Sequence, residues 1–209
     1  MTGAGMCSLG VAAVVLAALP RVHSAQAAPA PLAVKLRVLV AACADAPIEP
    51  AAWVDEHVAA VRALYEPHGI AISVEHGTFA PARCAALRRA ERDAFAAHVT
   101  MDGVVTVLVV PRVRDLDVPT YDLMGVHWRA RGRRWIFLTA RARPPVLAHE
   151  LGHYLGLPHD PAGGNLMTPG PSSPLWRSRT PPRPFAPTLT PAQVERLRAG
   201  VERGRAEMR

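Results

Sequence analysis

Hydrophobic positions recur along this chain with both the strand period and the helix period, so the sequence predicts a domain with strands and helices. Five apolar or alternating runs, rich in Val, Ile and Leu, predict strands at 34–42, 70–76, 103–110, 123–128 and 134–139. The third run, GVVTVLVV, is apolar without interruption, as in strands that are covered on both faces. We therefore expect it at the centre of the sheet, and we expect the last two runs to pair as a hairpin across Arg131-Gly132.

Helices are predicted between and after these strands. Apolar residues three and four positions apart predict helices over 51–65 and 85–99. Pro144-Pro145 suits the first turn of another helix, where the missing amide hydrogens would have no intrahelical partner. Gly, Pro and Ser after Asp160 predict a loop as far as Thr188, and the sequence Thr-Pro-Ala-Gln at 190–193 predicts a capping box at the start of a last helix.

The first residues have the composition of a secretory signal peptide. The apolar run 9–19 is too short to span a bilayer, and Ala25-Gln26-Ala27 after it is an A-x-A cleavage pattern. We expect 1–27 to be removed, which leaves 28–209 as a single domain of a secreted or periplasmic protein, with no stable membrane association. No Lys or Arg precedes the apolar run, so an uncleaved anchor and a misassigned start codon are the alternatives.

Export changes how the cysteines are interpreted. Cys7 would leave with the signal peptide, while Cys43 and Cys84 would remain as a pair in an oxidising compartment. We predict a disulfide between them, with two buried free thiols as the alternative.

The chain carries a formal net charge of +7, and most of its basic residues are Arg. A basic protein can suit an acidic partner, but these residues are scattered and accompanied by Asp and Glu, which favours an ordinary solvated surface. The sequence has no basic patch interleaved with aromatic residues and no helix-turn-helix pattern, so we expect no binding to nucleic acid.

The segment HELGHYLGLPHD contains the most specific chemistry of the chain. Residues four apart lie on one face of a helix, so His149 and His153 can bind one ion. Glu150 follows the first histidine, where its carboxylate can reach a metal-bound water without binding the metal. Gly156 can adopt the positive φ that ends a helix, which lets His159 reach the same ion. Three protein ligands leave a fourth position open, as in catalytic zinc sites.

This segment resembles the extended zinc motif of the metzincin clan of metalloproteases, H-E-x-x-H-x-x-G-x-x-H, with the Asp that follows the third histidine in some branches. The sequence Asn-Leu-Met-Thr at 165–168 resembles the Met-turn of that clan, with Met167 as a hydrophobic floor below the histidines. Its short spacing from His159 is similar to that of compact, pappalysin-like bacterial members. The resemblance implies an α+β fold with a mixed sheet of about five strands, a backing helix and an active-site helix. It also implies an N-terminal subdomain (28–156) and a small C-terminal subdomain (157–209).

The resemblance further implies zinc-dependent hydrolysis of a peptide or protein substrate by a monomer. One Zn²⁺ per chain would activate a water molecule, and Glu150 would take its proton and deliver it to the leaving amine. In the clan an edge strand binds the substrate, and 123–128 is our candidate for that edge. His127 on this strand could touch the substrate, but we favour an exposed strand histidine, and we expect Tyr154 to pack within its helix.

Two other functions fit parts of the sequence. An exported, non-enzymatic module could keep zinc to hold its fold together, but a structural site does not need Glu150 and normally has four protein ligands. A zinc hydrolase that acts on a non-peptide amide would use the same residues, because the specificity pockets lie in loops outside the motif.

Overall fold

The computed structural model describes residues 32–44, 46–162, 164–169 and 187–206. The predicted signal peptide and most of the predicted Pro-rich loop lie outside these residues. The elements follow the order β1 (Leu32–Cys43), β2 (Ala46–Pro47), α1 (Ala51–Tyr65), η1 (Glu66–His68), β3 (Ile70–Phe79), β4 (Ala85–Ala86), α2 (Arg89–Ala94), η2 (Phe95–His98), β5 (Val105–Val110), β6 (Arg112–Arg114), β7 (Asp122–Leu123), β8 (Gly125–Ala130), β9 (Arg133–Thr139), α3 (Pro144–Tyr154) and α4 (Pro191–Ala206). In this described part, no helix is both long enough and apolar enough to span a membrane.

The main sheet is mixed, as predicted. Strands β3, β1, β5 and β9 are adjacent and parallel, and β8 pairs antiparallel with β9 at the edge. The short strand β2 pairs with the end of β1. The uninterrupted apolar run therefore forms β5, which lies between β1 and β9 and is buried along its whole length.

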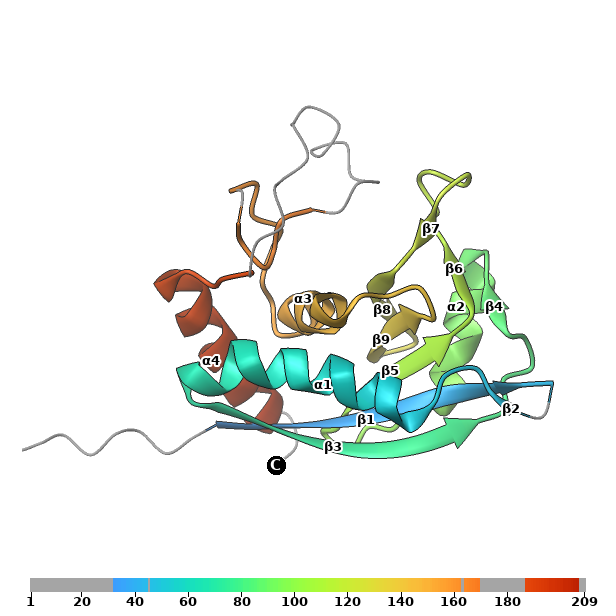
Figure 1. Ribbon diagram of the computed structural model, residues 1–209, viewed down its shortest axis with the longest axis horizontal. Helices are drawn as coiled ribbons and strands as arrows, with labels where there is room; N and C mark the ends of the chain where they lie inside the picture. The colour runs from blue at the N-terminus through green and yellow to red at the C-terminus, as the bar shows by residue number, and fades with distance from the viewer. Residues whose placement is uncertain (1–31, 45, 163, 170–186, 207–209) are drawn as a thin grey trace, which may run out of the picture.

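Two apolar layers explain why β5 is hydrophobic on both faces. Val107 and Val109 belong to a core that includes residues of α1, α3 and α4, whereas Leu108 and Val110 belong to a second core with residues of η2. The alternation of β-strand side chains sends successive residues into opposite layers. Helices α1 and α3 lie over the same face of the sheet and contact each other (Figure 1). Helix α3 thus packs against α1, and it also contacts strands β8 and β9.

The helix expected over 85–99 is shorter in the structure. Ala85–Ala86 forms β4, α2 begins only at Arg89, and η2 follows it as a separate turn. The Glu91 carboxylate accepts hydrogen bonds from the amides of Leu87 and Arg88, 2.9 and 3.1 Å away, so it caps the helix at this point. The segment between Val110 and Leu123, where the sequence pattern predicts no element, also contains strands, because β6 and β7 form a small second sheet with β4.

Two local predictions are confirmed. Cys43 and Cys84 form a disulfide that links residues 41 positions apart in the sequence. Helix α4 has the predicted capping box: the amide of Gln193 donates to Oγ1 of Thr190 (3.3 Å), and the amide of Thr190 donates to Oε1 of Gln193 (2.8 Å).

Candidate metal centre

Helix α3 brings two of the three candidate ligands onto one face. Its first two residues are Pro144 and Pro145, and His149 and His153 lie one turn apart, with ring centroids separated by 4.7 Å. The chain leaves the helix at Gly156, whose φ of 102° lies in the region that favours glycine. This turn brings His159 back, so that one nitrogen of each of the three imidazoles lies within 4.8 Å of the others.

Backbone carbonyls orient the two helical imidazoles. Nδ1 of His149 lies 2.7 Å from the carbonyl oxygen of Leu166, and Nδ1 of His153 lies 2.8 Å from that of Leu157. A nitrogen that faces a carbonyl must carry the proton, so Nε2 of each ring keeps its lone pair. Burial, followed by the charge of His153, lowers the pKa of His149 to about 4. Both rings are thus set up as neutral donors, which is the form that binds a metal.

Glu150 lies on the same helix as His149 and His153, and its carboxylate bonds to strand β8. Its side chain is 7% exposed, and burial raises the pKa of its carboxyl to about 8. Its only recorded partner within the described residues is the amide of His127 on β8, which donates to Oε2 at 2.8 Å. The close approach of helix and strand depends on Gly125, where a Cβ atom would lie 2.7 Å from Val146 and 2.9 Å from Cγ of Glu150.

Met167 lies directly under the metal-binding helix. It is fully buried, and a Cβ atom on Gly152 would lie only 2.6 Å from its sulfur. Gly152 faces the core between the two helical histidines, so its lack of a side chain lets the methionine pack against the backbone of α3. Met167 fills the floor of the site and offers no ligand to it.

A buried polar network connects this floor to α4. The side-chain amides of Asn165 and Gln193 exchange two hydrogen bonds of 2.8 and 2.9 Å. Asn165 also accepts from the amide of Met167 at 2.8 Å, and Gln193 donates to Asp160 at 3.3 Å. The amide of Asp160 donates in turn to the carbonyl of Met167 at 2.9 Å. The segment that contains His159 is therefore held against α4.

Two residues without a sequence-based assignment hold α3 in place. The hydroxyl of Tyr65 on α1 donates to the carbonyl of Ala148 at 2.8 Å, one residue before the first histidine. His57, also on α1, is buried, and its Nε2 lies 3.2 Å from the carbonyl of Ala142 just before the helix. Both lie on the buried face of amphipathic helix α1, where a polar side chain needs a hydrogen-bond partner. A polar residue at an apolar position of the helical pattern is the sequence signal that could have identified them.

The expectation that His127 is exposed was wrong. The residue is half-buried, its ring lies 5.5 Å from that of Tyr154, and its Nε2 is enclosed. Burial, followed by the charge of Arg129, lowers its pKa to about 4. The two-residue alternation of β8 turns His127 to the same face as Gly125, towards α3. Tyr154 packs as expected, under the guanidinium of Arg134, 4.3 Å from the ring centroid.

Three solved structures identify the fold of this chain. A scan against protein-family models found no match, and a search of curated proteins found no relative. Among solved structures, metalloproteinase-II from Bacteroides fragilis is similar to 82% of this chain, with a TM-score of 0.56 and 16% identity. The match covers 54% of that protein, so this chain spans about half of its length.

Two smaller structures match almost along their full length. Mature mirolysin from Tannerella forsythia, solved in complex with a cleaved peptide, covers 86% of this chain and 96% of its own, with a TM-score of 0.57 and 12% identity. Archaemetzincin from Methanopyrus kandleri covers 81% and 96%, with a TM-score of 0.51 and 21% identity. The chain therefore has the α+β fold of metzincin-type metalloproteases, with a histidine triad formed by helix α3 and the segment that follows it.

Proposed function

We propose that this chain is an exported zinc-dependent endopeptidase. The observation that carries the proposal is the combination of three convergent neutral imidazoles with a buried carboxylate that does not join them. Three nitrogen donors suit Zn²⁺ and leave one position open, and the Nε2 atoms of His149 and His153 are directed by their carbonyl partners. The metzincin-type fold supports the same chemistry.

The side chains then divide the work of hydrolysis. When bound, Zn²⁺ supplies a Lewis acid that polarises a carbonyl group and makes a water molecule more acidic. Glu150 accepts the proton of the attacking water and delivers it to the leaving nitrogen. The pKa of the Glu150 carboxyl, about 8 without a metal, would be lower with Zn²⁺ bound, because a nearby positive charge favours the ionised carboxylate. The amide of His127 holds that carboxylate by its hydrogen bond to Oε2.

Strand β8 supports a peptide as the substrate. The amide of Thr139 on β9 donates to the carbonyl of Met124, and those two residues lie opposite each other in the register of the hairpin. Because hydrogen-bonded and free positions alternate, the backbone groups of Gly125, His127 and Arg129 face away from β9. A peptide can pair with this edge beside Glu150, at the backbone groups that the hydrogen bond between His127 and Glu150 leaves free. Mirolysin, which shares the fold, was solved with a cleaved peptide.

Export rests on the sequence, with one structural argument in support. The apolar run 9–19 and the A-x-A pattern that follows it favour a signal peptide. The disulfide between Cys43 and Cys84 is the kind of bond that persists in oxidising compartments. We therefore propose that the mature protein acts in the periplasm or outside the cell.

The zinc and the activity can be tested with one set of variants. Metal analysis of the mature protein should give about one Zn²⁺ per chain, and the double variant His149→Ala/His153→Ala should lose it. Cleavage of an unfolded protein should be strong for the wild type and reduced by several orders of magnitude in Glu150→Ala, which keeps its metal. A zinc-binding module without activity would bind metal but cleave nothing. A hydrolase of another amide would bind metal and spare every peptide.

A further inference from the structure

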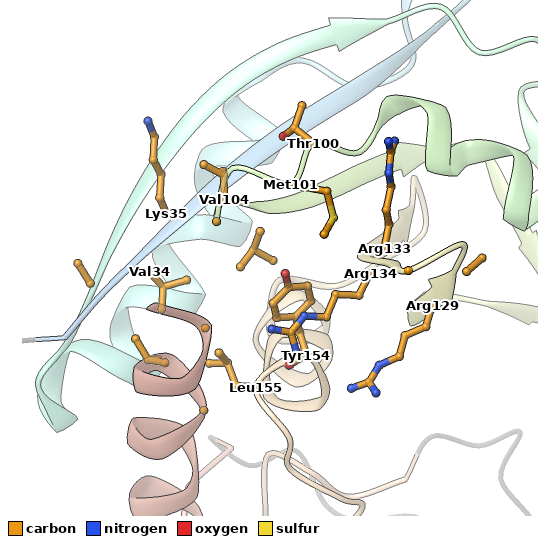
Figure 2. A pocket seen from close by; sticks show the side chains of 18 of the residues that line it. Val34, Lys35, Thr100, Met101, Val104, Arg129, Arg133, Arg134, Tyr154 and Leu155 are labelled. Carbon is orange, nitrogen blue, oxygen red and sulfur yellow. Dashed lines mark hydrogen bonds between the residues drawn. The ribbon is translucent and has the colours of Figure 1, made fainter. Parts of the chain in front are cut away.

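A pocket that is lined by none of the three histidines lies at the end of the helix that carries two of them. This pocket has a volume of about 510 Å³ and lies between the end of α3, the hairpin of β8 and β9, the start of β1 and β5, and α4. Its walls include apolar side chains, among them Val34, Val104 and Leu155 (Figure 2). Met101 lines it as well and is 72% exposed.

The charged side chains that line this pocket are all basic. The lining contains Lys35, Arg129, Arg131, Arg133 and Arg134, and no Asp or Glu. An apolar pocket with one sign of charge attracts a ligand of the opposite sign, because low-dielectric walls focus the field. The pocket is therefore suited to a ligand that is both acidic and partly apolar.

Not all of these charges are equally available. Lys35 forms an ion pair with Glu75, and the Arg133 guanidinium donates to two backbone carbonyls. Arg134 is stacked on Tyr154, as Figure 2 shows. Arg129, its cross-strand neighbour, is exposed and has no ion pair with any residue that the structure describes. Arg131, in the turn after β8, is also exposed and has no ion pair among the described residues. Of the two, Arg129 lies on β8 itself, so Arg129 offers the charge that a ligand paired with this strand could use.

Arg129 also links the pocket to the proposed substrate edge. It lies two residues after His127 on β8, so its backbone groups face the same edge of the sheet. Its side chain lies on the same face of the strand as that of His127, whose ring contacts Tyr154, and both Arg129 and Tyr154 line the pocket. A peptide that pairs antiparallel with β8 runs from Arg129 towards Gly125. If its scissile bond lies beside Glu150, which contacts His127, the residues N-terminal to that bond lie beside Arg129.

We propose that this pocket binds an acidic side chain of the substrate, located N-terminal to the scissile bond and followed or preceded by an apolar residue. The proposal rests on the proposed endopeptidase function and gives it a substrate class, acidic peptides. Arg129 supplies the charge, and the apolar lining receives the neighbouring side chain.

The test compares two fluorogenic peptides that differ only upstream of the cleaved bond, where one carries Glu and the other Gln. With zinc-loaded wild type at low salt, kcat/KM should be about fivefold higher for the Glu peptide, the upper range for one exposed ion pair. The preference should disappear in Arg129→Gln and reverse in Arg129→Glu. The matched control Arg196→Gln removes an exposed charge from α4 outside the pocket and should keep the preference.

Binding separates this proposal from the endopeptidase function. Fluorescence anisotropy with the Glu150→Gln variant should show tighter binding of the Glu peptide, and that difference should vanish in Glu150→Gln/Arg129→Gln and at high salt. Equal binding or equal kcat/KM for the two peptides would overturn the acidic pocket and leave the endopeptidase intact. If the wild type cleaves neither peptide nor any unfolded protein, the endopeptidase function fails, and charge-dependent binding alone still supports the pocket.

Discussion

Replacing Gln193 by Ala tests whether α4 holds the metal centre together. Gln193 caps its own helix through Thr190 and exchanges two hydrogen bonds with Asn165, which in turn fixes the turn before Met167. Its removal leaves the side-chain NH2 of Asn165 buried without a partner, which costs about 1–3 kcal/mol, and the lost cap costs about 1 kcal/mol more. Since Asp160 loses its contact as well, we expect a destabilisation of about 2–4 kcal/mol and weaker zinc binding.

Thr190→Ala is the matched control for this variant. It removes the cap hydroxyl of α4 but leaves the amide pair of Asn165 and Gln193 intact, so it should cost about 1 kcal/mol. Urea unfolding of the metal-free proteins measures both losses, and competition with a chromophoric chelator measures zinc affinity. We expect Gln193→Ala to lose affinity at least about tenfold and Thr190→Ala to keep it. Equal zinc affinity in the two variants would refute the proposed connection between α4 and His159.

Three further results are expected. Gly152→Ala should destabilise the protein by about 1–3 kcal/mol in urea, because its Cβ would lie 2.6 Å from the sulfur of buried Met167; unchanged stability would contradict this packing. His127→Pro removes the amide that donates to Glu150 and so raises the pKa of that carboxyl. The acid limb of the kcat/KM profile should then lie at higher pH than in the control His127→Ala, which keeps the amide. Identical profiles of the two variants would exclude this donor. The pKa of His149 is lowered to about 4, and a protonated imidazole cannot bind metal. Zinc should therefore stay bound during dialysis at about pH 6 and be released only as the pH falls towards 4. Release already at about pH 6 would show that the pKa of His149 is that of an ordinary histidine.

The metal centre is the part of the molecule that sequence reasoning reached most directly. The spacing of His149, Glu150 and His153 is set by the helix itself, and Gly156 supplies the one backbone conformation that returns the chain to His159. These are local relations, and no distant residue is needed to infer them. The main strands were equally accessible, because β5 and the hairpin have apolar patterns that depend only on which faces are covered.

The features that escaped sequence reasoning depend on contacts between distant segments. Strands of two or three residues, such as β4, β6 and β7, are too short to show an alternating pattern and exist through their pairing with one another. The same holds for Tyr65 and His57, whose partners lie 83 and 85 residues away. The basic pocket joins residues from six elements, and its charges look scattered along the sequence.

The register of a single hairpin connects the proposed catalysis and the proposed specificity. Arg131 and Gly132 both have positive φ, 53° and 73°, as a two-residue type I′ turn requires, and this turn fixes which residues of β8 face α3. In the observed register, His127 presents its amide to Glu150 and Arg129 presents its side chain to the pocket. A shift by one residue would turn both to the opposite face and direct their backbone groups to β9. The carboxylate would then lose its donor at the same moment as the pocket loses its free charge, so a variant of the turn should impair both together.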